Sequence, residues 1–151
     1  MENVVATKII ASCIVHATED IEKVKVALTN IFPEEIRGNI SIKEQKIEGH
    51  YGNPIIILGA EAGDKKIVEV FLENFSKILD KSEKRGLSRE FINYQDDKGN
   101  FFIRLDKQSA FKNEFHLQQQ DPIKIIIKIK KSKRLPKDSI FEYFQRIGII
   151  A

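Results

Sequence analysis

Hydrophobic and polar residues alternate most regularly near the carboxyl end of the chain. Between Pro122 and Lys130, isoleucine occupies every second position, and three of the four positions between are lysine. The isoleucine set is Ile123, Ile125, Ile127 and Ile129, and the opposite set is Lys124, Ile126, Lys128 and Lys130. Because successive side chains of a strand point to opposite sides of a sheet, this pattern predicts a strand with one apolar face and one mostly basic face.

Apolar spacing elsewhere predicts strands and helices in alternation. A mostly apolar stretch, 4–15, predicts an interior strand, and helical spacing predicts a helix after Thr18 and a longer one over 63–84. The remaining expected elements are strands near 40–47, 54–58, 91–94 and 101–105, a short helix over 106–111 and a last helix after Pro136. This order predicts an α+β fold of two layers: a mixed sheet of about five or six strands packed against two long helices, plus a C-terminal helix.

Length and composition bound the class of protein. A chain of 151 residues with 42% hydrophobic residues suits one domain with a sizeable core, spanning 1–151. A single cysteine, Cys13, excludes an intrachain disulfide framework. We find no apolar run near the ~20 residues that cross a bilayer. We therefore expect a cytoplasmic protein that makes no membrane contact.

Positive charge is concentrated in one stretch of the chain. Residues 123–137 contain seven basic residues and no acidic one, whereas the rest of the chain has 18 basic and 22 acidic residues. A local positive field on an otherwise acidic protein is typical of a surface that binds a polyanion. The same lysines could instead keep a solvated edge strand from aggregating, or dock an acidic surface of a ribonucleoprotein.

Motifs for catalysis, metals and cofactors are absent from the sequence. The three histidines, His16, His50 and His116, lie far apart without metal-ligand spacing, and no nucleotide-binding loop or nucleophile elbow occurs. Cys13 falls inside an apolar strand, where a thiol is unreactive. We expect no metal and no cofactor. An RNA-processing enzyme that uses His16 or His50 as an acid or base is the weaker alternative.

The sequence thus predicts a non-catalytic protein with a surface for a polyanion such as a nucleic acid. Phosphates are expected to meet six cations at the end of the chain: Lys124, Lys128, Lys130, Lys131, Lys133 and Arg134. Two further clusters are candidates for contacts with bases or sugars: His50 and Tyr51 in a glycine-flanked loop, and Arg104, Lys107 and Gln108 around a helix start. Alternatively, Tyr51 folds back on the core, and Asp106 simply caps the short helix.

Four motifs occur in an order that resembles a known family. They are His-Ala-Thr-Glu-Asp at 16–20, Glu-Gly-His-Tyr-Gly-Asn-Pro-Ile at 48–55, Gly-Asn-Phe at 99–101 with Arg-Leu-Asp-Lys-Gln at 104–108, and Asp-Pro-Ile-Lys at 121–124. Over residues 4–131 the chain is similar to the small archaeal RNA-binding proteins described as predicted exosome-associated subunits. The segment 132–151, with its helix, is an extension to that resemblance.

The resemblance implies a fold, a ligand and a set of partners. The fold would be similar to that of the large-subunit ribosomal protein that binds 5S rRNA. The ligand would be RNA in an archaeal cytoplasm, with the exosome or ribosome-related proteins as partners and a role in RNA processing or degradation. No catalytic residues carry over. A homodimer through the isoleucine-rich strand is compatible with any of these functions.

Overall fold

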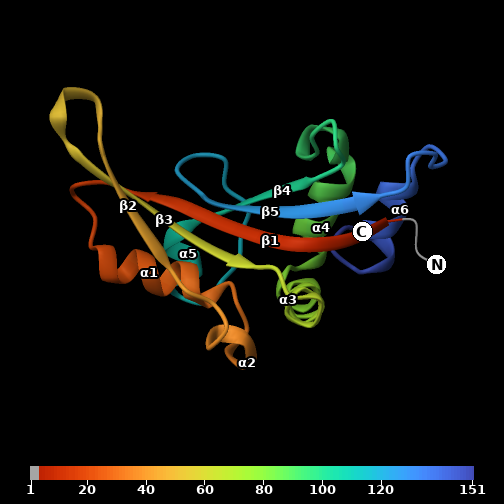
Figure 1. Ribbon diagram of the computed structural model, residues 1–151, viewed down its shortest axis with the longest axis horizontal. Coiled ribbons are helices and arrows are strands. Elements are labelled where there is room, and N and C mark those ends of the chain that lie inside the picture. Colours follow the sequence, from red (N-terminus) through yellow and green to blue (C-terminus); the bar gives the residue numbers. More distant parts are fainter. Residues whose placement is uncertain (1–3) are drawn as a thin grey trace.

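The computed structural model describes residues 4–151, apart from the side chain of His50, and is built on one five-stranded sheet (Figure 1). The strands are β1 (Val4–Val15), β2 (Lys43–Glu48), β3 (Pro54–Ala62), β4 (Phe101–Leu105) and β5 (Ile123–Lys131). Their order across the sheet is β2-β3-β1-β5-β4, so the first strand lies in the middle. The mostly apolar sequence of β1 fits this interior position.

Six helices and two short 3-10 helices complete the fold. They are α1 (Ile21–Asn30), α2 (Glu34–Arg37), η1 (His50–Gly52), α3 (Lys65–Ile78), α4 (Lys81–Arg89), η2 (Phe91–Tyr94), α5 (Lys107–Phe111) and α6 (Ser139–Arg146). The α+β class, the five strands and the C-terminal helix are therefore confirmed. No helix of residues 4–151 combines the length and apolarity that crossing a bilayer requires.

The sheet is antiparallel throughout rather than mixed, which corrects one part of the prediction. Strand β1 runs opposite to both of its neighbours, β3 and β5, and the outer pairs β2–β3 and β4–β5 are antiparallel as well. The turn η1 joins β2 directly to β3, and two strands joined by a tight turn must run in opposite directions.

Three local predictions also differ from the structure. The long helix expected over 63–84 is two helices, because Leu79 is extended and the Asp80 carboxylate accepts a hydrogen bond from the Glu83 amide, which starts α4. Helix α1 is capped by Asp20 rather than Thr18. The segment 91–94 is a 3-10 helix, and only Gln95 after it pairs with Phe101.

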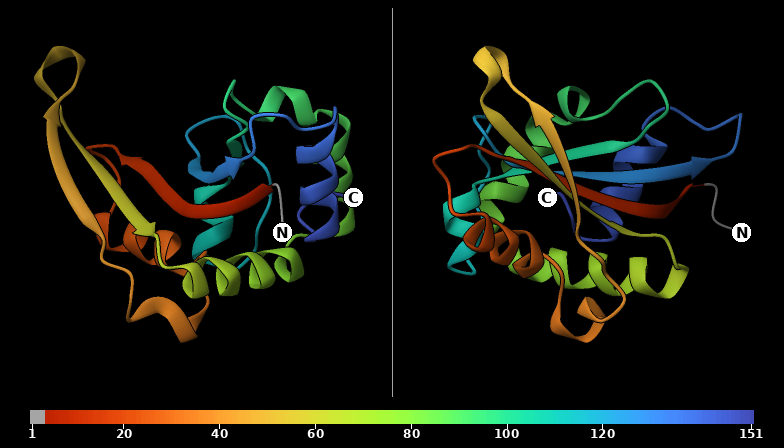
Figure 2. Two further views of the ribbon diagram at one scale, coloured as in Figure 1. Left: turned by 45° about the vertical axis from the view of Figure 1, so that its right-hand side comes forward. Right: turned by 60° about the vertical axis from the view of Figure 1, so that its left-hand side comes forward.

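One face of the sheet forms the core. Alternate side chains of each inner strand are buried there, such as Ile9 and Ala11 of β1 and Ile125 and Ile127 of β5. Helices α1, α3 and α6 contact β1, and the views of Figure 2 show these helices gathered on one side of the sheet. The chain therefore has two layers, and no helix of residues 4–151 packs on the other face of the sheet.

The C-terminal extension is part of this core. Phe144 of α6 is fully buried, with its ring centroid 4.7 Å from that of Phe101. The Tyr143 hydroxyl accepts a hydrogen bond of 3.0 Å from the Ala6 amide, at the point where β1 changes register against β5. The segment 132–151, which lies outside the motif resemblance, thus closes one end of the fold.

Candidate nucleic-acid interface

The predicted alternation of apolar and basic side chains in β5 is confirmed, because the two sets differ in burial. Ile123, Ile125 and Ile127 are fully buried, whereas Lys124 and Lys128, which point the other way, are partly exposed. The strand therefore presents its lysines on the sheet face without helices. We call this face, with the side chains it carries, the open face: Lys8, Ile10, Ser12, Phe102, Arg104, Lys124, Ile126 and Lys128.

Strand register arranges these side chains in rows across the open face. Ile10 of β1 lies opposite Ile126 of β5, which in turn lies opposite Phe102 of β4, so three apolar side chains form one row, and Glu61 of β3 lies opposite Ile10 at its other end. The row beside it consists of Ser12, Lys124 and Arg104, and the row on the other side pairs Lys8 with Lys128. Adjacent rows are two residues apart along a strand, or about 7 Å. Cationic rows therefore border an apolar row.

The cations Arg104, Lys124 and Lys128 form no ion pair within residues 4–151. Burial alone would raise the pKa of Asp96, but hydrogen bonds from Asn100 and Lys98 lower it, and the charge of Lys128 adds to this effect. Lys8, which lies opposite Lys128, is paired, because its ammonium lies 3.0 Å from Glu61 Oε2. The guanidinium of Arg104 and the ammonium of Lys124 each lie 5.9 Å from the centre of the Phe102 ring. Their positive charge is available to an external anion.

The basic surface continues beyond the strand. Lys130 and Lys131 end β5, and the loop that follows carries Lys133 and Arg134; all four side chains are exposed. No carboxylate of the described residues forms an ion pair with them. The six predicted phosphate-binding cations thus lie along β5 and the loop after it, although Lys131 belongs by alternation to the opposite side of the strand and lines a pocket beside α4 and η2.

The glycine-flanked loop lies at the opposite end of the molecule. It forms the tip of the β2–β3 hairpin, which extends beyond the sheet in Figure 1, and the Tyr51 side chain is 94% exposed. Tyr51 is therefore not folded back on the core. The side chain of His50 lies outside the described part of the chain. β1 joins the hairpin end to the Lys131 end and is about 36 Å long at about 3.3 Å per residue, so the two clusters are not one site.

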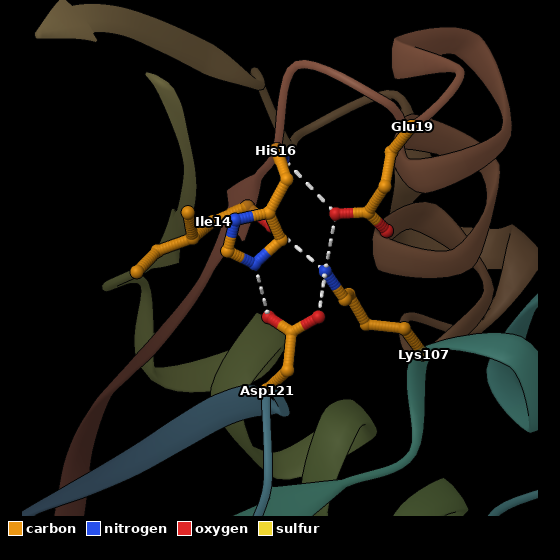
Figure 3. A network of polar contacts seen from close by, with 5 residues as sticks. All are labelled: Ile14, His16, Glu19, Lys107 and Asp121. Atoms are coloured by element: carbon orange, nitrogen blue, oxygen red, sulfur yellow. Dashed lines mark hydrogen bonds and ion pairs between the residues drawn. The ribbon is translucent and has the colours of Figure 1, made fainter. Parts of the chain in front are cut away.

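Lys107 lies in a network of polar contacts instead of on the surface (Figure 3). Its side chain is 8% exposed, and its ammonium donates to the Ile14 carbonyl at 2.8 Å, to Glu19 Oε1 at 2.9 Å and to Asp121 Oδ2 at 2.9 Å. An ammonium has three hydrogens, so these three acceptors satisfy it completely. His16 joins the network through its Nε2, which lies 3.0 Å from Asp121 Oδ1.

The network shifts the pKa of its members in opposite directions. Burial alone would lower the pKa of Lys107, but hydrogen bonds and charge from Glu19 and Asp121 raise it. Burial alone would raise the pKa of Asp121, but hydrogen bonds and charge from Lys107 and His16 lower it. The charged forms are therefore favoured at neutral pH, and the network ties the end of β1 to α5 and to the start of β5.

These contacts change the roles of two predicted RNA contacts. Lys107 has no donor left for a phosphate, so we assign it a structural role in place of the expected RNA contact. Gln108, the next residue, is exposed but borders a shallow pocket between α1 and α5 in the helix layer. Of the cluster around this helix start, only Arg104 joins the lysines on the open face.

Folding also places two histidines beside carboxylates, which the sequence did not predict. His16 lies with Glu19 and Asp121, and His116 with Asp80 and Glu83. In the first group, the ammonium of Lys107 already binds both carboxylates. In the second, Asp80 caps α4. Each group thus has a structural explanation.

Cys13 is expected to be unreactive in the native protein. Its side chain is buried in β1, and desolvation is the main reason that the pKa of its thiol rises to about 11, with Lys107 opposing and Glu19 and Asp121 adding to the rise. Because the thiolate is the reactive form, a disulfide reagent at pH 8 should modify Cys13 only as the chain unfolds. Absorbance of the released thiolate, with and without guanidinium, measures this; rapid modification of the native protein would contradict it.

Sequence reasoning missed Phe102. It lies between Phe101 and Ile103, which are fully buried, so its own side chain must point to the other face of β4. The signal was an apolar residue on the polar side of an alternating strand, two positions before Arg104. Only the pairing of β4 with β5 shows that this ring lies beside two cations.

Comparisons with known proteins agree with this fold and surface. The chain is 38% identical over 118 residues to the RNA-binding protein PAB1135 of Pyrococcus abyssi. This match covers 77% of the chain and 77% of the relative. Among solved structures it is similar to protein AF2318 of Archaeoglobus fulgidus, of family DUF54, with a TM-score of 0.80 and 27% identity. The match covers 95% of this chain and 99% of AF2318. A second DUF54 protein, Mth689 of Methanothermobacter thermautotrophicus, is similar with a TM-score of 0.72 and 29% identity. That match covers 95% of this chain and 98% of Mth689.

The resemblance to archaeal RNA-binding proteins is therefore confirmed, and the similarity to AF2318 covers 95% of the chain. A family model described as RNA binding matches residues 8–129, which contain the open face and the Lys107 network. With this match and the relative in Pyrococcus, the chain belongs to the RNA-binding family.

Proposed function

We propose that the protein binds RNA through the open face and the basic end of β5, without catalysing a reaction. The observation that carries the proposal is a set of cations on an uncovered sheet face, of which Arg104, Lys124 and Lys128 form no ion pair with a carboxylate of residues 4–151. Such cations release the ions condensed on a nucleic acid when they meet its phosphates, which favours binding whatever the base sequence.

The proposed phosphate contacts follow the surface from β4 to the loop after β5. They are Arg104, Lys124, Lys128, Lys130, Lys131, Lys133 and Arg134. His50 and Tyr51, at the tip of the hairpin, form a separate proposed contact for bases or sugars further along the strand of RNA. Lysines spaced two residues apart on a strand lie about 7 Å from each other, which resembles the spacing of successive phosphates.

A narrower role rests on the resemblance of the four motifs. We infer that the protein acts as an accessory factor in RNA processing or degradation in the cytoplasm, with the exosome or ribosome-related proteins as partners. The name of the Pyrococcus relative, an RNA-binding protein, supports the ligand and not the partner. Likeness to the 5S-rRNA-binding ribosomal protein stays a prediction of the same resemblance.

Salt dependence tests the proposed function. If five phosphates are neutralised, the logarithm of the affinity for single-stranded RNA should fall against the logarithm of salt with a slope of about −3.5, since each contact contributes about −0.7. Fluorescence anisotropy of a labelled RNA, titrated with the full chain from low to physiological salt, gives this slope. A flat response would mean that phosphates do not drive binding and would contradict the proposal.

A further inference from the structure

The apolar row on the open face ends in an aromatic ring that the core does not use. The buried side of β4 is complete without it, because Phe101, Ile103 and Leu105 are fully buried. Phe102 points away from them into the open face, beside Ile126 of β5. β4 is the edge strand of the sheet, so the ring is covered by no further strand. Phe102 is partly exposed, and a partly exposed aromatic ring beside the apolar side chain of Ile126 offers a surface on which a ligand can pack.

The neighbours of Phe102 identify what could bind it. The cations of Arg104 and Lys124 lie at equal distances of 5.9 Å from the ring centre, and neither forms an ion pair within the described chain. A π surface with a positive charge on its border matches a nucleotide, which has a flat base joined to a phosphate. A surface meant for phosphates alone would need no ring.

The geometry also distinguishes paired from unpaired RNA. A duplex presents phosphates and sugars at its surface and keeps its bases stacked inside, so it cannot place a base on Phe102. A single strand can splay its bases onto the row of Ile10, Ile126 and Phe102 while its phosphates follow the cationic rows on either side. The arrangement of rows thus favours a single strand.

We propose that the open face selects single-stranded RNA by stacking one unpaired base on Phe102, with Arg104 and Lys124 holding the adjacent phosphates. This inference rests on the proposed function, because it specifies the form of RNA that the same face binds. It adds a base contact that salt cannot screen and that charge alone does not provide.

Phe102→Leu tests the inference, because leucine keeps an apolar side chain but removes the π surface. The matched control is Phe111→Leu: Phe111 is also partly exposed, but it lies on α5 in the helix layer. The probes are an unstructured RNA of 12 nucleotides carrying one 2-aminopurine, and a blunt duplex of 12 base pairs. Thermal unfolding of both variants checks that the fold is intact.

We expect Phe102→Leu to weaken binding of the single strand about tenfold and to leave duplex binding unchanged, since base stacking is lost only in the first case. Phe111→Leu should leave both affinities unchanged, and Phe102→Trp should restore or exceed the original affinity for the single strand. The wild-type chain should quench the fluorescence of the 2-aminopurine more than Phe102→Leu does at saturation.

Each other result would overturn either the stacking of a base on Phe102 or RNA binding as a whole. Equal affinity of the wild-type chain for single strand and duplex, or single-strand binding that Phe102→Leu does not change, would overturn the stacking inference and leave electrostatic RNA binding in place. A loss of both affinities in folded Phe102→Leu would do the same. Failure of the wild-type chain to bind either probe at low salt would overturn the proposed function together with the inference.

Discussion

Reversing the charge of Lys128 and Lys130 to glutamate is expected to weaken RNA binding about 25-fold or more at 0.1 M salt. At a slope of about −0.7, each phosphate contact contributes about fivefold at 0.1 M relative to 1 M salt, and two are lost. The new carboxylates would also repel phosphate. Both lysines are on the side of β5 away from the core, so the fold should be unaffected. Anisotropy titrations at several salt concentrations measure the affinity and the reduced slope.

The matched control reverses two lysines in the helix layer. Lys65 and Lys66 are exposed at the start of α3, so Lys65→Glu with Lys66→Glu changes the net charge equally but away from the open face. Full RNA affinity in the β5 variant would contradict the proposed interface. If that variant also lost a protein that co-purifies with the wild-type chain, the lysines would instead dock an acidic partner.

Replacing Lys107 with methionine is expected to destabilise the protein by about 2 kcal/mol at pH 7. Removal of one partner from a buried ion pair costs about 3–5 kcal/mol, and we expect less because Glu19 and Asp121 are partly exposed. Methionine keeps most of the apolar stem, so the change mainly removes the ammonium. For a chain of this size the unfolding temperature should fall by about 4–8 °C, which calorimetry measures.

The effect of Lys107→Met should depend on pH in a defined direction. The pKa of Asp121 is lowered in the folded protein, so its contribution to stability is present above the ordinary pKa of about 4 and lost as the pH falls through the lower, folded value. The pKa of Lys107 is raised, so its contribution is present below about pH 10 and lost as the pH rises through the folded value. The difference between wild type and variant should therefore be largest near neutral pH and shrink in strong acid.

Lys112→Met is the matched control for this prediction. Lys112 directly follows α5, is exposed, and has no ion pair among the described side chains, so its loss should change the unfolding temperature little at any pH. Urea titrations at pH 7 and pH 3 compare the two variants. A difference between wild type and Lys107→Met that stayed constant over this range would contradict an ionic role for the network.

Local patterns predicted the strands that carry the interface. The alternation of isoleucine and lysine in β5 and the apolar run of β1 follow from the two-residue repeat of a strand, so residue type alone showed which side faces the core. The boundaries of α3 and α4 were not predictable in this way, because apolar spacing continues through Leu79 while a single extended residue and the Asp80 cap divide the helix.

Residues that were grouped by sequence motif separated in space. Arg104 and Lys107 are three positions apart, yet one lies on the open face and the other is buried among Glu19, Asp121 and the Ile14 carbonyl. Both are cations near a helix start, and nothing local distinguishes them. Three of the motifs that resemble the family contribute to this network, so their spacing reflects a structural requirement.

The alternation of side chains and the position of charge along the chain therefore determined the fold class, the buried face of β5 and the existence of a basic surface, because these depend on neighbours in sequence. The tertiary structure alone decided which cations remain available and that Phe102 lies beside two of them. Those properties depend on strand order and register, which bring together residues more than twenty positions apart.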